Sequence, residues 1–475
     1  MIDLNWMLLT IKRQGQNHVP VGLLFVVFIM GTALIPNLGM SQYDIKRLLL
    51  LVFLLVGFVY LFFMRTQDKV SIGNWSSVAW LFFILAQLVN AYFINNQLYS
   101  FLDTLLLFAM SVAFVGYLRV VNSTPALKNY LLLALVYGLV VYYGFVLLQY
   151  LFFLISPVPW TIHLLSEAGF VNVRFLNQLM ILLFPLLLFA DQFGAISKRL
   201  VRFVAVMTVA LLLNSDGRGA LVMALFESVL LVLLIKYTQY DAKMFRSRLL
   251  KIWLLGCLVF AVFFVWIPSF RLDIFNISPI RLTESTRFSM WDEALELWRN
   301  KPWWGYGGMS YTDKQGGVTF SFGHPHNSIV QILYEYGLMG FIALAVAVLV
   351  LLKQVVFHLI NESADRLLVP VLVALLGGAG LSLVSGVIVM PFSQLVLFVL
   401  ILVLVSIVFG DASGTATGGF RVPLYVSINA LKLVGLIVFC LLACVSYLTW
   451  SHIMGQDVIR YGVGPRFWLI GSLEI

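Results

Sequence analysis

Charged side chains are scarce in this sequence. Asp, Glu, Lys and Arg together make up only 11% of the 475 residues, whereas hydrophobic residues make up 61%. Soluble globular proteins carry about 25% charged residues, and a soluble chain of this length divides into about three domains. So few charges cannot solvate the surfaces of three domains, and the mean hydropathy is +0.99. The composition therefore excludes an ordinary soluble protein and indicates a polytopic membrane protein.

Cysteine is also rare, and several motifs of metal and nucleotide chemistry are missing. The three cysteines, Cys257, Cys440 and Cys444, lie in apolar stretches and do not form a set with zinc-site spacing. We interpret them as small core residues. The predicted outer connections lack an Asp-x-Asp pair, and the chain lacks a G-x-x-x-x-G-K-S/T phosphate loop. We therefore predict no metal and no cofactor, and we exclude ATP-driven chemistry.

Long apolar runs dominate the chain. A transmembrane helix needs about 20 mostly apolar residues, and on this basis the sequence predicts about 12–13 spans. The candidate spans are residues 19–38, 48–64, 75–95, 99–118, 130–156, 170–190, 200–214, 218–236, 250–268, 327–352, 367–387, 390–410 and 426–450. The predicted fold class is an all-α polytopic membrane protein. We divide it into an N-terminal transmembrane bundle of about nine spans (1–268), a long connection (269–325), a C-terminal transmembrane bundle (326–450) and a tail (451–475).

The Lys and Arg residues predict the orientation. With the N-terminus in the cytoplasm, most of the 30 Lys and Arg residues fall in cytoplasmic connections, as the positive-inside rule requires. The connection 269–325 then lies outside, which for a bacterial inner membrane is the periplasm. An odd number of spans leaves the tail on that side too. The net charge of +9 follows from this bias and implies membrane lipid, not nucleic acid, as a partner.

The long outer connection contains a predicted amphipathic helix over residues 285–300. Apolar side chains recur there at helical spacing, at Phe288, Trp291, Leu295 and Trp298. Three carboxylates fall on the other face, at Asp292, Glu293 and Glu296. Pro302 ends the helix. Tryptophans are typical of segments at the membrane interface, and we expect this helix to roof an outward-facing cavity.

Arginines on the outer side are the strongest functional signal. Arg174, Arg218 and Arg287 each stand at the start of a predicted helix, and Arg281 precedes Arg287 by six residues. The helix dipole disfavours a cation at that position. Helix N-termini bind anions, and arginine forks onto phosphate oxygens. Several such ends meeting under one lid would hold a diphosphate. The alternative for each arginine is a contact with a lipid headgroup or a loop carboxylate.

Two histidines flank a proline where the long connection meets the next span, in His324-Pro325-His326-Asn327. Pro325 or Asn327 can begin the helix that follows. A histidine at a helix N-terminus, close to arginines, is biased toward the neutral imidazole. This is the form that a general base needs at pH 7. His326 is therefore a candidate base, and the alternative is a histidine with a structural role.

Three residues further along the same span have predicted packing roles. Glu335 lies nine residues after His326, which places it on the opposite face of a helix. We therefore assign Glu335 to helix packing or a buried hydrogen bond and not to catalysis. We expect Gly337 and Gly340 to allow the close approach of a neighbouring helix. Glu227, in the middle of another span, has no evident function.

These residues resemble the O-antigen ligase family of membrane glycosyltransferases. The resemblance rests on four stretches within residues 170–345: His324-Pro325-His326-Asn327 with Gln331, Glu335, Gly337 and Gly340; Ser215-Asp216-Gly217-Arg218-Gly219-Ala220; Arg287 to Trp291 with Pro302 and residues 305–307; and Arg174. The second stretch is similar to the family's Ser-Arg-Gly-Ala element with an Asp-Gly insertion. This insertion weakens the assignment of Arg218.

The resemblance implies a GT-C-like fold and a metal-independent, inverting transfer in the periplasm. The implied donor is a preassembled glycan on undecaprenyl diphosphate. Carried onto this sequence, His326 would deprotonate the acceptor hydroxyl, and Arg174, Arg218 and Arg287 would hold the diphosphate and stabilise the leaving group. Arg281, His324 and Asn327 are further candidates for substrate binding.

The family leaves the acceptor open. Its branches include ligases that use lipid A-core, polymerases that extend O-antigen, and oligosaccharyltransferases that modify Ser or Thr of pilin-like proteins. The His-Pro-His-Asn form and residues 307–311 resemble the protein-glycosylating branch slightly more. A more distant alternative is a transporter or flippase of lipid-linked sugars. Such transporters often have repeat symmetry and paired charges at mid-membrane depth, and the sequence shows neither.

Overall fold

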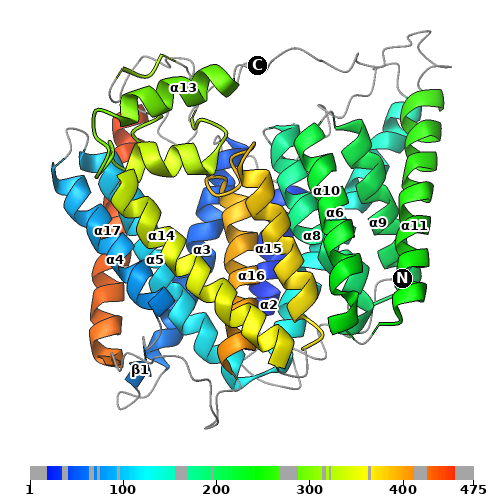
Figure 1. Ribbon diagram of the computed structural model, residues 1–475, viewed down its shortest axis with the longest axis horizontal. Helices are drawn as coiled ribbons and strands as arrows, with labels where there is room; N and C mark the ends of the chain where they lie inside the picture. Colours follow the sequence, from blue (N-terminus) through cyan, green and yellow to red (C-terminus); the bar gives the residue numbers. More distant parts are fainter. Residues whose placement is uncertain are drawn as a thin grey trace.

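The structure is a computed structural model of the 475-residue chain. It describes residues 19–34, 41–63, 69–71, 75–93, 97–155, 170, 172–194, 196–215, 217–238, 240–267, 287–312, 317–319, 323–361, 365–410 and 425–454. Figure 1 shows these residues as a bundle of long helices with one shorter helix, α13, at one end. A helix overlaps every span predicted from the sequence. The all-α polytopic fold is therefore confirmed.

The first half of the chain supplies eight of the bundle's helices in sequence order. They are α2 (Val19–Thr32), α3 (Gln42–Phe62), α4 (Trp75–Phe93), α5 (Gln97–Ser123), α6 (Ala126–Ile155), α8 (Val173–Phe193), α9 (Lys198–Asn214) and α10 (Arg218–Leu234). A 3-10 turn, η2 (Ile235–Tyr237), follows α10. Helix α11 (Ala242–Val259) continues directly into η3 (Phe260–Trp266), which is a π-helix.

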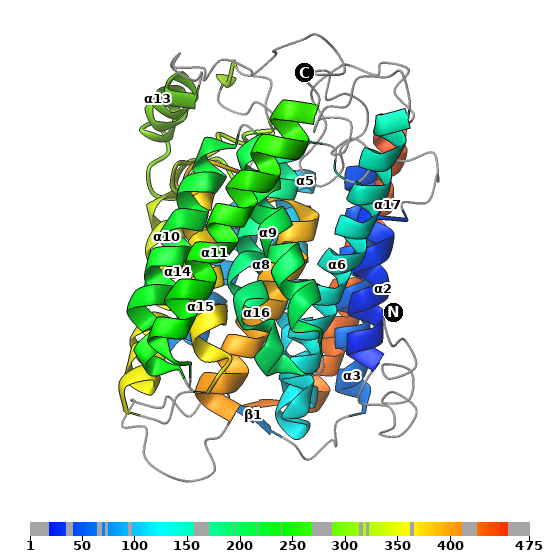
Figure 2. The ribbon, with the colours of Figure 1, turned by 90° about the vertical axis from the view of Figure 1, so that its right-hand side faces the viewer.

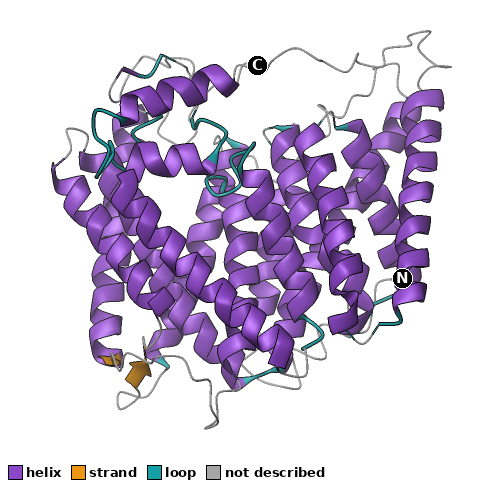
Figure 3. Cartoon of the chain, viewed as in Figure 1, coloured by secondary structure: helices purple, strands orange, loops and turns teal. Residues whose placement is uncertain are grey.

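The second half supplies α13 (Arg287–Trp298), α14 (Ser328–Asn361), α15 (Leu368–Ser382), α16 (Pro391–Gly410) and α17 (Ile428–Met454). The described strands are β1 (Lys69–Ser71) and β2 (Tyr425–Ser427), which pair antiparallel with Val70 opposite Val426. Figure 3 shows this pair at the opposite end of the bundle from the loops around α13.

Nine helices within the described ranges are long and apolar enough to cross a membrane. Helices α2 and α15 and most of α4 are apolar as well but shorter. Helix α9 has 17 residues and carries three basic residues near its start, Lys198, Arg199 and Arg202. Large apolar side chains face outward on α4, α10, α11 and α17, which is the pattern expected where lipid is the surrounding solvent. The chain is therefore a multi-pass membrane protein.

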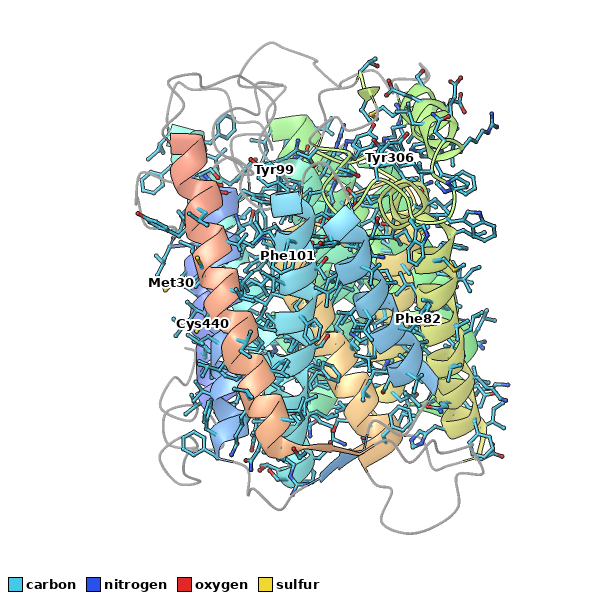
Figure 4. All side chains as sticks on the ribbon, turned by 90° about the vertical axis from the view of Figure 1, so that its left-hand side faces the viewer. Met30, Phe82, Tyr99, Phe101, Tyr306 and Cys440 are labelled. Atoms are coloured by element: carbon cyan, nitrogen blue, oxygen red, sulfur yellow. The ribbon has the colours of Figure 1, made fainter. Side chains whose placement is uncertain are left out.

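Helices from the two halves of the chain pack against one another. The most extensive helix pairs are α4 with α14, α3 with α5, and α8 with α15. Helix α8 lies at the centre, with nearly all its side chains buried. Figure 2 shows α13 standing above the ends of the long helices. In Figure 4, side chains fill the space between the helices, and Tyr306 lies at the end of the bundle that α13 covers.

The cysteines do not lie in the core. Cys257, Cys440 and Cys444 are free thiols with exposed side chains on α11 and α17, so the interpretation of them as core residues was wrong. An apolar run in a membrane helix does not show which residues face the bundle, because lipid accepts a thiol as readily as a protein core does.

Candidate functional site

The His324-Pro325-His326-Asn327 segment forms a tight turn that leads into α14. The side chain of Asn327 begins the helix, because its Oδ1 accepts hydrogen bonds from the N–H groups of Ile329 (2.9 Å) and Val330 (3.2 Å). His326 has φ 57°, a left-handed conformation that is uncommon for residues other than glycine. Such backbone strain costs about 1–3 kcal/mol and tends to occur at functional sites.

His324 supports the strained residue from inside the protein. Its ring is only 5% exposed, and its Nδ1 accepts a hydrogen bond of 3.0 Å from the backbone N–H of His326. The ring also lies directly on Gly386, where a Cβ would overlap its Nε2 and Cε1 atoms. The two histidine rings meet edge to face, with centroids 4.2 Å apart. His324 therefore fixes the turn in which His326 stands.

Three of the predicted site residues meet here. The imidazole of His326 is half-buried, and its Nδ1 atom is fully buried. Burial, followed by the positive charges of Arg174 and Arg287, lowers the pKa of the His326 imidazole to about 3. Burial and the charge of Arg174 also lower the pKa of the Arg287 guanidinium. Two guanidinium groups thus act on a neutral imidazole and on each other.

The three arginines stand where the sequence predicted them, at helix starts. Arg174 is the second residue of α8, Arg218 the first of α10 and Arg287 the first of α13. The side chains of Arg174 and Arg218 are exposed, and that of Arg287 is half-buried. Among the described residues, none of the three forms a salt bridge with a carboxylate. Within the part of the chain that the structure describes, no carboxylate therefore neutralises these charges.

Arg218 is tied to the site through its neighbours. Gly219 packs against Val384, where a Cβ would come within 2.8 Å of the valine side chain. Val384 belongs to the loop that also holds Gly386 under His324. Gly217, on the other side of Arg218, lies against Asn177 of α8. Arg281 and Asp216 lie outside the described residues.

Helix α13 covers the site and is joined to it by a hydrogen bond. Trp291 Nε1 donates to the carbonyl oxygen of Pro325 at 2.8 Å. Met290 and Ala294 form the buried face of α13, whereas Phe288 is 58% exposed. The predicted helix is confirmed, and Trp291 and Leu295 pack inward as expected, but Phe288 does not. Since Met and Ala complete a stripe beside the aromatic residues, spacing of aromatic residues alone could not locate the buried side.

The carboxylate of Glu293 also faces the protein and not the solvent, contrary to the prediction. Its Oε1 accepts hydrogen bonds from the backbone N–H of Thr319 at 2.8 Å and from the Thr319 hydroxyl at 2.5 Å. Tyr311, whose ring is fully buried, interacts electrostatically with this carboxylate, and burial raises the pKa of its phenol. Helix α13, which we call the lid, is thus attached to the outer loops by polar as well as apolar contacts.

Helix α14 consists of two arms that meet at a break. Gly337, with φ 64° and ψ −172°, interrupts the helix, and this backbone region is essentially restricted to glycine. Figure 1 shows the first arm, residues 328–336, lying across the end of the bundle beneath α13, and the second arm running down its side. The first arm therefore presents His326 along the surface of the bundle.

The segment 302–307 supplies the hydrogen bonds that the break removes. In a continuous helix, the carbonyls of residues 334 and 335 would accept from the N–H groups of residues 338 and 339. Instead, Tyr306 N–H donates to the residue 334 carbonyl at 2.9 Å and Gly307 N–H to the residue 335 carbonyl at 2.7 Å. Leu338 N–H donates to the Pro302 carbonyl at 2.8 Å and Met339 N–H to the residue 303 carbonyl at 3.1 Å. All four freed groups are satisfied.

The packing roles predicted for α14 are largely confirmed. Glu335 is fully buried, and its Oε2 accepts a hydrogen bond of 3.0 Å from Gln331 Nε2. Gly340 allows α4 to approach, because a Cβ there would lie 3.1 Å from Gln87 Nε2. Gly337 also permits a close approach, but of the residue 303 carbonyl and not of a helix. The break at Gly337 was not predicted, since a glycine is tolerated within a membrane helix.

Sequence reasoning missed the loop between α15 and α16, residues 383–390. Its Ser385 hydroxyl accepts from Gln178 Nε2 of α8 at 2.9 Å. Gly386 supports His324, and the Val389 carbonyl accepts from the hydroxyl of Tyr43 at 3.2 Å. The adjacent polar pair Asn177-Gln178 in an apolar span was the available signal. For the loop itself, its small residues are the only signal in the sequence.

A fourth arginine, Arg47 of α3, was also missed. It is 2% exposed, and its guanidinium donates to Gln394 Oε1 at 2.5 Å and to the carbonyl of Val389 at 3.3 Å. These two hydrogen bonds place the guanidinium of Arg47 beside the loop that supports His324. It holds α3 and α16 together at the site.

Comparison with known proteins agrees with this geometry. Within the described residues, no three His, Cys, Asp or Glu side chains form a group that could hold a metal ion. No curated protein matches the chain. The model of the O-antigen ligase family matches residues 203–345, a segment that contains Arg218, Arg287 and both histidines of the turn. Residues 203–345 of this multi-pass membrane protein are therefore similar to the O-antigen ligase family.

Proposed function

We propose that this protein is a glycosyltransferase that moves a preassembled glycan from undecaprenyl diphosphate to an acceptor hydroxyl at the periplasmic face of the bacterial inner membrane. One observation carries the proposal: a neutral, half-buried imidazole, that of His326, stands at the start of α14 within the electrostatic reach of two arginines. A base beside a cationic site is the combination that removal of a hydroxyl proton and departure of a diphosphate require.

His326 acts as the general base. Its Nδ1 atom is buried, so Nε2 is the nitrogen that receives the proton of the acceptor hydroxyl. As the proton leaves, the acceptor oxygen forms a bond to the anomeric carbon of the glycan. The bond from that carbon to the diphosphate oxygen breaks on the opposite face, which inverts the configuration. The electron pair of the broken bond stays on the departing undecaprenyl diphosphate.

Arg174 and Arg287 receive the charge of the leaving group. Both stand at helix starts, where free N–H groups already favour an anion, and no described carboxylate neutralises either of them. Arginine can bind diphosphate oxygens in a bidentate manner. Arg218, which begins α10 beside the same loop, extends this clamp. Asn327 uses its Oδ1 to cap α14 and keeps its amide N–H groups for a substrate.

Donor binding also adjusts the base. A conjugate acid with a pKa of about 3 belongs to a weak base, because general bases work best with a pKa near the operating pH. The diphosphate brings negative charge to Arg174 and Arg287 and offsets the field that disfavours the imidazolium. The basicity of His326 therefore rises when the donor is bound. This order protects the enzyme from activating an acceptor without a donor.

The test is a transfer assay with purified protein and an undecaprenyl-diphosphate-linked glycan. Three acceptors are compared: lipid A-core, a pilin-type peptide with Ser or Thr, and a second lipid-linked glycan, which would reveal polymerase activity. Product with one of them supports the proposal. No product with any acceptor would overturn it in favour of transport of lipid-linked sugars.

His326→Ala gives the sharper form of this test. We expect the variant to fold and to lose transfer, since the hydroxyl proton then has no acceptor. The matched control is His358→Ala, which removes a buried histidine from the far end of α14 and should retain transfer. Activity in His326→Ala would end the role of this residue as base.

A further inference from the structure

Asn177 is a buried polar residue that the proposed reaction does not use. It lies three residues after Arg174 on α8, so both side chains project from the same side of the helix. Its side chain is only 3% exposed. Its Oδ1 is fully buried and accepts no hydrogen bond from the described residues. An unpaired buried carbonyl oxygen destabilises a fold, so packing alone would favour leucine at this position.

The adjacent residue, Gln178, shows what a purely structural amide does on this helix. Its Nε2 donates to Ser385 at 2.9 Å, and its Oε1 accepts from Ser393 at 2.7 Å. Both ends of the Gln178 amide are therefore satisfied, and they join α8 to α16 and to the loop that precedes it. The amide oxygen of Asn177, in contrast, accepts no hydrogen bond from the described residues.

The carboxamide of Asn177 is seated on Gly217. A Cβ at position 217 would overlap Asn177 Nδ2 and would lie 3.1 Å from Asn177 Cγ. The backbone of Gly217 has φ −81° and ψ 68°, so no left-handed conformation demands a glycine. Residue 217 must be a glycine for lack of space, because the Asn177 carboxamide occupies the position that a side chain of residue 217 would take. The contact with Asn177 thus explains why the second residue of the Asp-Gly insertion is a glycine.

Gly217 immediately precedes Arg218 and is the cap residue of α10. Among the described residues, no side chain caps this helix start. The N–H of Gly217 reaches only Ser215 Oγ, at 3.4 Å, a long hydrogen bond. The contact with Asn177 therefore constrains where α10, and with it Arg218, begins relative to α8.

We propose that Asn177 is a positioning residue of the donor site: its carboxamide, seated on Gly217, sets the separation between the start of α8, which carries Arg174, and the start of α10, which carries Arg218. The inference rests on the proposed function, because it concerns the spacing of two arginines that grip one diphosphate. Asn177 lies outside the segment that matches the family.

A double-substitution cycle tests the contact. Gly217→Ala should raise the KM for the lipid-linked donor about tenfold, because the added methyl group pushes α10 away from α8. Asn177→Ala should raise it about threefold, and the double variant should resemble Asn177→Ala alone, because the methyl group then has room. The KM for the acceptor should stay unchanged throughout. Gly144→Ala is the control partner, since a Cβ there meets nothing within 4 Å, and its cycle with Asn177→Ala should be additive.

Asn177→Leu separates positioning from stability. We expect its melting temperature to equal or exceed that of the wild type, while transfer falls about tenfold because Leu does not reproduce the planar amide on Gly217. Wild-type transfer by Asn177→Leu, or losses that multiply in the Gly217→Ala double variant, would overturn the positioning role while the transferase stands. A wild-type protein without transfer would instead overturn the proposed function and this role with it.

Discussion

The Nδ1 atom of His324 accepts a hydrogen bond of 3.0 Å from the backbone N–H of His326. This bond holds His326 in a left-handed conformation, with φ 57°, that an isolated chain would rarely adopt. The buried His324 therefore affects the site by fixing the backbone of His326. Its support comes in turn from Gly386, which leaves room for the ring.

The first prediction concerns this acceptor atom. His324→Phe keeps a ring on Gly386 but cannot accept the His326 N–H, so kcat should fall about tenfold, which corresponds to the loss of one hydrogen bond of ~1.4 kcal/mol. His324→Asn places an oxygen close to the former Nδ1 and should retain more activity. Steady-state kinetics of both variants decide the matter. Equal activity in the two would show that the hydrogen bond has no role.

The second prediction concerns pH. Because burial and the charges of Arg174 and Arg287 lower the pKa of His326 to about 3, its imidazole should stay neutral between pH 8 and pH 5. Removing a nearby positive charge favours the imidazolium. Arg174→Gln and Arg287→Gln should therefore raise the pKa, though only in part, since burial is the larger cause.

The measurement is the rate at which diethyl pyrocarbonate modifies His326, followed by mass spectrometry. The reagent attacks the neutral imidazole, so the wild-type rate should be flat over this pH range. When the range is extended below pH 5, the rates of the two Gln variants should begin to fall at a higher pH than the wild-type rate does. A wild-type rate that declines below pH 6.5 would contradict the assigned electrostatics.

The third prediction separates charge from geometry at the clamp. Arg174→Lys and Arg287→Lys keep the positive charge but lose the planar fork. If the guanidinium groups bind diphosphate oxygens in pairs, each Lys variant should lose about 10- to 100-fold in kcat/KM for the donor. Arg202→Lys, on an exposed part of α9, is the matched control and should have no effect. Full activity of the Lys variants would show that the two residues attract the diphosphate by charge alone and not by bidentate hydrogen bonding.

The fourth prediction concerns the lid. Trp291→Phe removes the hydrogen bond from Nε1 to the Pro325 carbonyl while keeping an aromatic ring. Transfer should fall about threefold to tenfold, because one such bond is worth about 1 kcal/mol. Trp298→Phe removes a similar bond to the carbonyl of Pro302, which lies away from the turn. It should affect transfer less, and an equal loss in both would argue against a specific link between α13 and the turn.

The fifth prediction concerns the break in α14. At Gly337, an alanine would be forced into a backbone region that costs about 1–3 kcal/mol and would strike the carbonyl of residue 303. Gly337→Ala should therefore lower the melting temperature in detergent by several degrees. Gly144→Ala, in the interior of α6 with no neighbour near its Cβ, should leave it unchanged or raise it. A stable Gly337→Ala variant would mean that the break is easily straightened.

The sequence predicted those features that depend on local pattern. Runs of apolar residues placed a helix at every predicted span, because a helix in lipid must satisfy its own backbone. The arginines at helix starts and the His-Pro-His-Asn turn were found because each departs from what a membrane helix normally requires. The nine-residue spacing from His326 placed Glu335 correctly in a packing role.

Features that depend on contacts between distant segments could not be predicted in this way. The break at Gly337 exists because residues 302–307 satisfy its backbone groups, and no local pattern reveals such a partner. Arg47 and Gly386 belong to the site through residues more than 60 positions away in sequence. The cysteines were misplaced because apolar composition does not distinguish a lipid-facing side chain from a core one.

The loop 383–390 receives contacts from α3, α8, α10 and His324, yet it lies beyond the segment that matches the family, residues 203–345. The matching segment therefore cannot be exchanged between proteins on its own. A chimera that exchanged only these residues with a protein of that family would place its histidine turn against a loop from a different protein. To exchange specificity between members, the graft must carry the loop and its partners on α3 and α8 as well.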